Sequence, residues 1–355
     1  MSRIAVVLFN LGGPDGPAAV RPFLLNLFSD PAIIAAPWPL RRVLAEAISR
    51  TRRKLAAANY AAMGGASPLL AATEAQAEAL QASLAEALPR DEVRCLVAMR
   101  YWRPTAAAAA RALAAFEPDE VVLLPLYPQF STTTTASSLA AWRRVWPGAC
   151  RTICCYFEDE AFIAAHATTV LAAWRAAGSP GKVRVLFSAH GLPRRIAAAG
   201  DPYQWQVERT CARIAEQLGA AWDWQVCYQS RVGPLQWIGP STVEAIERAA
   251  ADGLGVLVVP VAFVSEHVET LVELDRDYAE VALRVGAEPY LRAPALGCEP
   301  LFIAALARLV RAALAQPAGV RPGGESCPSG FSCCALRRPE PGRYPKPGRW
   351  AEPGR

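Results

Sequence analysis

The chain has 355 residues, of which 53% are hydrophobic, so it is long enough for two domains with a sizeable core. Its formal net charge is +5, but residues 317–355 hold seven Lys and Arg against three Glu, and the nearly neutral remainder argues against a nucleic-acid groove. No apolar run reaches the roughly 18 residues of a membrane span, and the N-terminus shows no signal-peptide cleavage site, which favours a cytoplasmic protein.

Short β-branched runs alternate along the chain with alanine- and leucine-rich helical patterns. Seven strands are predicted, at residues 3–9, 92–99, 120–126, 151–156, 182–188, 222–228 and 255–262, with amphipathic helices at 73–88 and 201–219. Most of these strands are apolar on both faces, as in a parallel sheet that is covered by helices. The βαβ rhythm therefore predicts an α/β, doubly wound fold.

The two halves of the chain resemble each other. Residues 93–100, VRCLVAMR, are similar to residues 183–190, VRVLFSAH. Short apolar strands also resemble one another by chance, so an unrelated pair of segments is the alternative. A duplication predicts two lobes, residues 1–150 and 151–316, that face a common cleft. A Cys/Pro/Arg-rich tail at 317–355 follows, and its composition predicts partial disorder.

Several loops carry residues suited to a large, flat or apolar ligand. The segment NLGGPDG at 10–16 lacks the GxGxxG spacing of a dinucleotide site, but its glycines indicate that a large group approaches the backbone. The apolar loop at 27–40 is interpreted as a lip for an apolar ligand, a shallow membrane contact, or plain core packing. Arg100 and Tyr101 at a strand end suit a flat anionic ligand. The segment FSTTTTASS at 130–138 supplies hydroxyl donors.

Two of the three histidines stand at predicted strand ends. His190 follows an apolar strand before a Gly/Pro turn, and His267 lies two residues before Glu269 after another strand. Imidazole and carboxylate groups offer ligands for a divalent first-row metal, and a neutral imidazole is also a general base. A single histidine there would more simply bond a backbone carbonyl, but the matching pair favours a functional role. His166 is interpreted as an ordinary helix-face residue.

Acidic residues recur at every fourth position, at Glu269, Glu273 and Asp277. On a helix they form one column, in which neighbouring charges repel by a few tenths of a kcal/mol per pair. A solvated helix face is the usual meaning of such charges. The apolar residues between them, and the shortage of basic partners at i+4, instead favour a path for a cation or for protons.

The ten cysteines include two groups. Cys327, Cys333 and Cys334 in the tail have spacing typical of a metal cluster, and thiolates suit iron–sulfur clusters or zinc. Three thiols leave one ligand to come from elsewhere in the chain. The second group of cysteines, at 150–155, is one source.

Eight ordered segments of the chain resemble ferrochelatase, the family that inserts ferrous iron into protoporphyrin IX. They are NLGGP, GGASPL, RYWRPT, YPQFSTTTTASSL, LFSAHGLP, GDPYQWQV, CYQSRVGPLQWIGPST and PVAFVSEHVETLVELDRDY, and the resemblance covers residues 3–315. It implies the terminal step of haem biosynthesis, a lyase reaction whose substrates are Fe²⁺ and protoporphyrin IX. It also implies the chelatase class II fold, in which two Rossmann-like lobes enclose a porphyrin cleft.

The resemblance also implies roles for particular residues. His190 and Glu269 match the family's metal-binding and catalytic pair, which removes pyrrole protons, and His267 matches the second histidine of that loop. Glu273 and Asp277 match an acidic line on a π-type helix and are expected to bind the metal with the first pair. The implied porphyrin pocket consists of Leu11, Arg100, Tyr101, Ser131 and Trp237. Leu11 stands where some members of the family have methionine.

The tail resembles the cysteine group of those ferrochelatases that carry a [2Fe–2S] cluster. Its three cysteines would then be three of the ligands. The fourth ligand of the animal enzymes lies in the YPQFS segment, where this chain has Thr132. The fourth ligand is then Cys150, Cys154 or Cys155, or the chain holds no cluster.

Two other functions share these features. A chelatase for coproporphyrin III or sirohydrochlorin would use the same acidic line, whereas a non-catalytic tetrapyrrole or metal carrier would not need both His190 and Glu269. The apolar lip at 27–40 favours protoporphyrin, because burying additional carboxylates without partners is costly. The same lip predicts peripheral contact with the inner face of the cell membrane. A monomer and a homodimer are both compatible with the sequence, and no nucleic-acid partner is expected.

Overall fold

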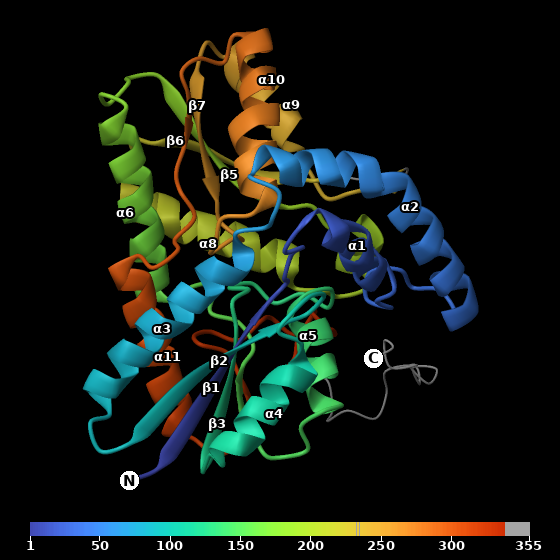
Figure 1. The fold of residues 1–355 in the computed structure, drawn as a ribbon. Helices are drawn as coiled ribbons and strands as arrows, with labels where there is room; N and C mark the ends of the chain where they lie inside the picture. The colour runs from blue at the N-terminus through green and yellow to red at the C-terminus, as the bar shows by residue number, and fades with distance from the viewer. Residues whose placement is uncertain (232, 234, 338–355) are drawn as a thin grey trace.

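The structure is a computed structural model that describes residues 1–231, 233 and 235–337. Two parallel sheets with helices on their faces make up the fold (Figure 1). The first sheet has the order β2-β1-β3-β4-β9, and the second has the order β6-β5-β7-β8. The strands are β1 (Arg3–Asn10), β2 (Glu92–Met99), β3 (Glu120–Pro125), β4 (Arg151–Ile153), β5 (Val183–His190), β6 (Asp223–Gln229), β7 (Gly255–Pro260), β8 (Tyr290–Arg292) and β9 (Gly319–Arg321). The predicted α/β, doubly wound class is confirmed.

Helices connect these strands and cover them. They are η1 (Pro17–Ala19), α1 (Val20–Phe28), α2 (Trp38–Ala62), α3 (Leu69–Ala87), α4 (Ala106–Phe116), α5 (Thr135–Arg143), α6 (Glu160–Ala176), α7 (Arg194–Ala198), α8 (Tyr203–Leu218), α9 (Thr242–Ala251), η2 (Glu269–Asp277), α10 (Tyr278–Val285) and α11 (Pro300–Leu314). The helices predicted from the sequence coincide with most of α3 and α8. No helix in the described part of the chain is both long enough and apolar enough to cross a membrane.

The two sheets share one hydrophobic core. Alternate residues of β1 point to opposite faces, so Val7 packs with α4 and α5 while Leu8 joins a larger cluster. That larger cluster also takes Phe187 from β5 and residues of α3, α6, α8 and α11. The helices between the sheets therefore contact both of them. This shared core fixes the two sheets relative to each other, and it positions any site formed between them.

Two strands of the first sheet come from beyond residue 150. β4 pairs with β3, and β9, which belongs to the predicted tail, pairs with β4. The division expected at residues 150 and 316 therefore does not coincide with the boundary between the sheets. β4 is also shorter than predicted, since it ends at Ile153, and the Tyr156 N–H donates instead to the Pro128 carbonyl at 2.8 Å.

Candidate active site

The carboxyl ends of β5 and β6 lie side by side and form one edge of the site. His190 is the last residue of β5, and it pairs with Gln229, the last residue of β6. The next residue, Gly191, donates its N–H to the Gln229 carbonyl at 2.8 Å. A Cβ atom at Gly191 would lie 2.8 Å from that same oxygen and 3.1 Å from the Trp237 ring. Only glycine allows the backbone to turn this closely beneath the tryptophan.

Glu269 stands between two histidines at the start of η2. Its Oε1 lies 3.5 Å from Nε2 of His190, and its Oε2 lies 3.7 Å from Nε2 of His267. Nδ1 of His190 lies 2.6 Å from the Gly191 carbonyl, and Nδ1 of His267 lies 3.2 Å from the Ser265 carbonyl. Carbonyl oxygens only accept hydrogen bonds, so both Nδ1 atoms carry protons. Both rings therefore direct Nε2 at the carboxylate.

Burial and charge act against each other in this group. Burial lowers the pKa of His190, but the charge and hydrogen bond of Glu269 outweigh it and raise the pKa to about 9. Burial raises the pKa of Glu269, but the two histidines outweigh it and hold the pKa well below its ordinary value. At neutral pH the pair is therefore imidazolium and carboxylate. Because the His190 side chain is 41% exposed, solvent screens part of this attraction.

The acidic column lies on a π-helix, η2, as the resemblance implied. Glu273 is held by its neighbours, and its carboxylate accepts from the Ser230 N–H at 2.9 Å, the Tyr278 hydroxyl at 2.7 Å and the Gln229 amide at 3.1 Å. Asp277, nearer the surface, pairs with Arg276 at 2.9 Å. Hydrogen bonds and this ion pair offset the repulsion expected within the column. Across the described residues, no three His, Cys, Asp or Glu side chains converge as a ready metal site.

The predicted pocket residues lie in different surroundings. Leu11 and Tyr101 pack in one apolar cluster with Val268, which immediately precedes Glu269. The Arg100 guanidinium is already engaged, since it donates to the buried Asp30 carboxylate and to the Ser137 hydroxyl, both at 2.6 Å.

The other two predicted pocket residues also have defined contacts. Ser131 donates to Asp201 at 3.1 Å and is buried. The Trp237 Nε1 atom is buried without a hydrogen-bond partner among the described residues. Trp237 therefore has an unused donor beside the turn that follows His190.

Sequence reasoning missed the residues that support this site. Asp30, Gln229, Ser230 and Tyr278 hold Arg100 and Glu273. Gln229, Ser230 and Tyr278 lie within two of the eight ordered segments, which was the available signal, whereas Asp30 stands in no distinguishing pattern. His166 lies on a helix face as predicted, on the side of α6 that is buried in the core, with its ring 4.8 Å from that of Phe162. Burial lowers its pKa to about 3, so this histidine stays neutral.

The cysteines of the tail meet one of the internal cysteines. Cys327 hydrogen-bonds Cys334, and the charge of Cys334 acts on Cys155. Cys154 lies 3.6 Å from Cys155, sulfur to sulfur. Cys154 and Cys155 lie in an apolar cluster with Phe130, Phe157, Trp205 and Ala335. Cys333 points elsewhere, toward the Ala199 carbonyl at 3.3 Å. Thiols are the ligand type that iron–sulfur clusters use, although those of the described residues do not converge as a ready metal site.

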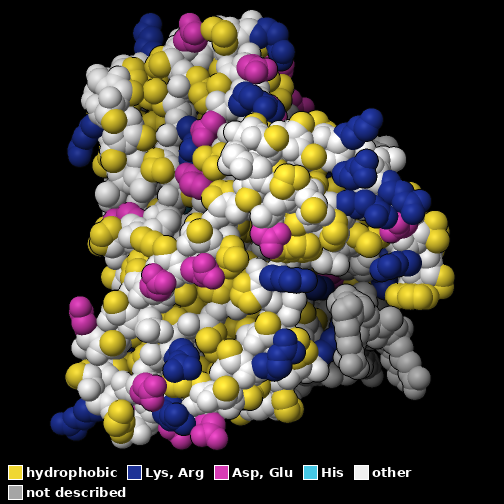
Figure 2. Space-filling model, in the orientation of Figure 1, with side chains coloured by type: hydrophobic (Ala, Val, Ile, Leu, Met, Phe, Trp, Pro, Cys, Tyr) yellow, Lys and Arg dark blue, Asp and Glu magenta, His cyan; other side chains and the backbone are white. Residues whose placement is uncertain are grey.

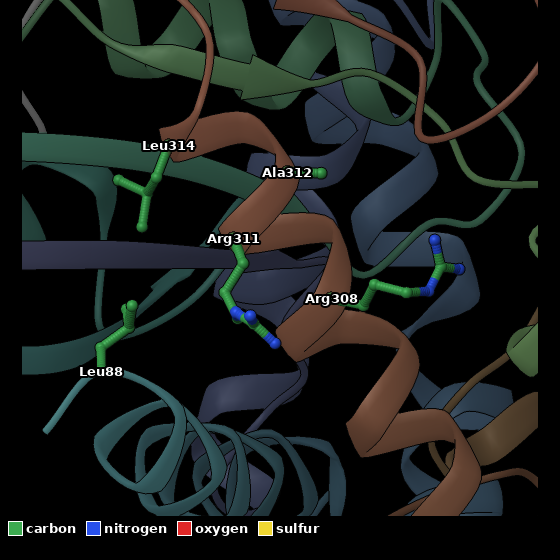
Figure 3. Close-up of a pocket in the computed structure, with 5 residues that line it drawn as sticks. All are labelled: Leu88, Arg308, Arg311, Ala312 and Leu314. Carbon is green, nitrogen blue, oxygen red and sulfur yellow. The ribbon is translucent and has the colours of Figure 1, made fainter.

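A surface hollow of about 370 Å³ lies away from all of these residues. Leu88, just after α3, lines it together with four residues of α11, Arg308, Arg311, Ala312 and Leu314 (Figure 3). Arg308 is paired with the buried Asp159. The hollow contains none of the predicted site residues. The candidate site is therefore identified by its histidines and carboxylates and not by the shape of the surface.

The chain is similar to known proteins over most of its length. The family model named Ferrochelatase matches residues 3–314. Ferrochelatase from Caulobacter vibrioides is 58% identical over 335 residues, 94% of this chain and 95% of that protein. Ferrochelatase from Phenylobacterium zucineum is 55% identical over 337 residues, 94% and 98% of the two chains. The solved structure of SirB from Bacillus subtilis with Fe³⁺ is 13% identical with a TM-score of 0.49, covering 88% of this chain and 96% of that one.

Proposed function

The chain belongs to the ferrochelatase family, and on this premise we propose that it inserts ferrous iron into protoporphyrin IX, with His190 and Glu269 acting at the reacting nitrogens. The family itself establishes metal insertion into a porphyrin for haem synthesis. The observation that carries the assignment of residues is the 3.5 Å approach of His190 Nε2 to Glu269 Oε1. This pair stands beside the apolar cluster of Leu11, Tyr101 and Val268.

The reaction exchanges one Fe²⁺ for two pyrrole protons. A flat macrocycle hides its nitrogen lone pairs, so binding that favours a ruffled form lowers the barrier. His190 can accept a pyrrole proton at Nε2 only after its own Nε2 proton has left. Glu269, whose carboxylate faces that nitrogen, takes a proton onward or binds the incoming metal. Glu273 and Asp277 continue the line of carboxylates toward the surface and serve iron entry or proton exit.

The wall of the pocket supports protoporphyrin as the tetrapyrrole. Leu11, Tyr101 and Val268 share their cluster with residues of α1 and α2, so one side of the site is apolar. The nearby Arg100 is already paired with Asp30. Additional substrate carboxylates at this wall would be buried without a cation, which costs free energy.

A comparison of substrates tests this proposal. Purified protein with Fe²⁺ under anaerobic conditions is expected to form protohaem at a rate well above that of metal insertion into coproporphyrin III or sirohydrochlorin. Faster turnover of either alternative would assign the chain to that tetrapyrrole. Stoichiometric binding of porphyrin without turnover would instead support a carrier.

A [2Fe–2S] cluster is proposed for the thiols of the tail. Cys327, Cys333 and Cys334 would supply three ligands, which requires Cys333 to turn away from the Ala199 carbonyl. Cys155 is the best-placed fourth, because the charge of Cys334 acts on it and Gln206 bonds both Cys155 and Cys327. Cys150 lies in a different cluster of side chains, with Trp146. When bound, a cluster would join the tail to the body of the protein, and no catalytic step is assigned to it.

Two cysteine variants distinguish the fourth ligand. Cys155→Ser is expected to lose the visible absorbance of the cluster and most of its iron and acid-labile sulfide, because a hydroxyl is a poor ligand for iron in such clusters. Cys150→Ser is the control and is expected to keep both. Loss of the cluster in the control but not in Cys155→Ser would assign the ligand to Cys150. Wild-type protein without iron and sulfide after anaerobic preparation would remove the cluster altogether.

Peripheral contact with the inner face of the cell membrane is proposed through the exposed side of α2, beside the predicted lip. Ile33 of the lip packs inward against the apolar cluster of Tyr101, whereas Trp38, Leu40 and Val43 are exposed. Helix α2 holds six Lys and Arg against one Glu, and basic side chains gather on the right of the face in Figure 2. Exposed apolar groups beside positive charge favour an anionic bilayer.

Sedimentation with lipid vesicles tests this contact. Trp38→Glu is expected to weaken binding to anionic vesicles several-fold, because one anchor is lost and a negative charge is added. The control is Trp224→Glu, since Trp224 on β6 is similarly exposed, at 39% against 44%. Equal binding by both variants, or no dependence on anionic lipid, would contradict the proposal.

A further inference from the structure

A buried glutamine of α3 reaches from the first sheet's layer to the loop that carries His267. Gln76 is fully buried, and its amide nitrogen donates to the Val264 carbonyl at 2.8 Å and to the Gly297 carbonyl at 2.9 Å. Its amide oxygen accepts from the Ser265 hydroxyl at 2.9 Å. Both amide donors and the acceptor are therefore used. All three partners lie more than 180 residues away in the sequence.

These bonds attach the loop between β7 and η2 to α3, and they also join α3 to the segment around Gly297. The Val264 carbonyl also accepts from the Gly297 N–H at 2.9 Å, so Gln76 closes a three-way junction of backbone. Because Gln76 is fully buried, losing its three hydrogen bonds would leave polar groups at this junction less well paired. Gln76 therefore links α3 to the loop that carries His267.

The junction connects directly to the histidine. Ser265, whose hydroxyl is bound by Gln76, offers its carbonyl to Nδ1 of His267 at 3.2 Å. This contact places the proton on Nδ1 and turns Nε2 toward the Glu269 carboxylate at 3.7 Å. A short chain of contacts thus runs from Gln76 through Ser265 and His267 to Glu269.

We propose that Gln76 is a positioning residue for metal insertion, which sets the orientation and the Nδ1 proton of His267 through the Ser265 segment. It contacts no reacting atom itself. This inference rests on the proposed function, since it takes His267 and Glu269 to belong to the reacting site. Its geometric part, the orientation of His267, can be tested without the reaction.

The main variant is Gln76→Met, which keeps a similar length and volume but removes the three hydrogen bonds of the amide; the Val264 carbonyl keeps its bond from the Gly297 N–H. On the same helix, the exposed Gln81 accepts from the Cys95 N–H of β2 at 2.9 Å. Gln81→Met is therefore the matched control. Gln76→Glu is a second variant, which keeps an acceptor for Ser265 but replaces the two amide donors.

Imidazole nitrogen NMR of the substrate-free protein provides the first readout. The chain has only three histidines, so their signals can be assigned from single substitutions. In Gln76→Met and Gln76→Glu the Nδ1–H signal of His267 is expected to shift or disappear. The signals of the buried His166 serve as an internal reference, and Gln81→Met is expected to match the wild type.

Chelation kinetics provide the second readout. Gln76→Met is expected to lower kcat on the order of tenfold, because a small misplacement of a reacting group is costly. The KM for protoporphyrin is expected to change less than about twofold, since Gln76 does not line the apolar cluster, and the pH dependence of kcat is expected to shift. A general loss of stability would lower the Tm without moving the pH profile.

The outcomes separate the two proposals. An unchanged His267 signal in both Gln76 variants overturns the positioning role, whatever happens to the rate. A displaced His267 signal with a wild-type rate and pH profile supports the orientation by Gln76 but overturns its importance for chelation, and it counts against His267 in the proposed function. Equal effects of Gln81→Met would also overturn the inference.

Discussion

Replacing His190 with alanine is expected to abolish metal insertion while porphyrin binding survives. The variant loses the imidazole that accepts a pyrrole proton, and such groups contribute roughly 10²–10⁴-fold to rate. The apolar cluster of Leu11 and Tyr101 does not depend on His190, so affinity for protoporphyrin is expected to change little. The measurements are the initial rate of protohaem formation and a fluorescence titration of porphyrin binding.

A second histidine supplies the control for this variant. His166→Leu removes a buried histidine that has no hydrogen-bond partner for its ring among the described residues, and it is expected to keep wild-type turnover. Near-normal turnover by His190→Ala would remove His190 from the mechanism. Loss of porphyrin binding together with turnover would make its role structural.

The raised pKa of His190 predicts how activity and stability depend on pH. With a pKa of about 9, the imidazole is protonated at neutral pH, so the rate is expected to rise as pH increases toward 9. Because the pKa in the folded chain is above the ordinary value of 6.5, protonation stabilises the fold. That contribution is fully present below about pH 6.5 and is lost as pH rises through 9. His190→Ala is expected to lack this loss in thermal unfolding measured across the same range.

Replacing Glu269 with glutamine is expected to reduce turnover by about 10²-fold or more, since glutamine is neither a base nor a charged metal ligand. The same change removes the negative charge that raises the pKa of His190. The His190 midpoint, followed by NMR, is therefore expected to fall from about 9 toward 6.5. These two measurements report the chemical and the electrostatic role of one carboxylate separately.

Stability on the acid side provides a further check of the same variant. The pKa of Glu269 is held below its ordinary value of 4.5, so its charge stabilises the fold above about pH 4.5, and this contribution is lost as pH falls. Glu269→Gln is expected to lack this dependence. Glu280→Gln, at an exposed acid on α10, is the control. A His190 midpoint that stayed near 9 in Glu269→Gln would show that another group raises it.

The strands could be predicted closely because their pattern is local. β1, β5 and β7 are continuous apolar runs that end at Gly, Pro or polar residues, and burial on both faces explains that composition. The position of His190 at a strand end follows from the same pattern. β9 could not be predicted, because three residues in a Pro- and Gly-rich tail show no period and become a strand only by pairing with β4.

The sequence by itself determined which residues are candidates for the chemistry of the site. The every-fourth spacing of Glu269, Glu273 and Asp277 is visible in the sequence alone, as are two histidines at strand ends and the cysteines of the tail. Charge and periodicity are properties of neighbours along the chain, so they can be read without a fold.

Only the tertiary structure decided which of these groups meet. The pairing of His190 with Glu269, the ion pair of Arg100 with Asp30 and the reach of Gln76 to the His267 loop all join distant segments. Such contacts depend on sheet order, register and helix packing, and local pattern carries none of that information. The acidic column depends on both the sequence and the fold. The sequence sets the spacing of its charges, and the fold supplies the partners that hold Glu273 in place.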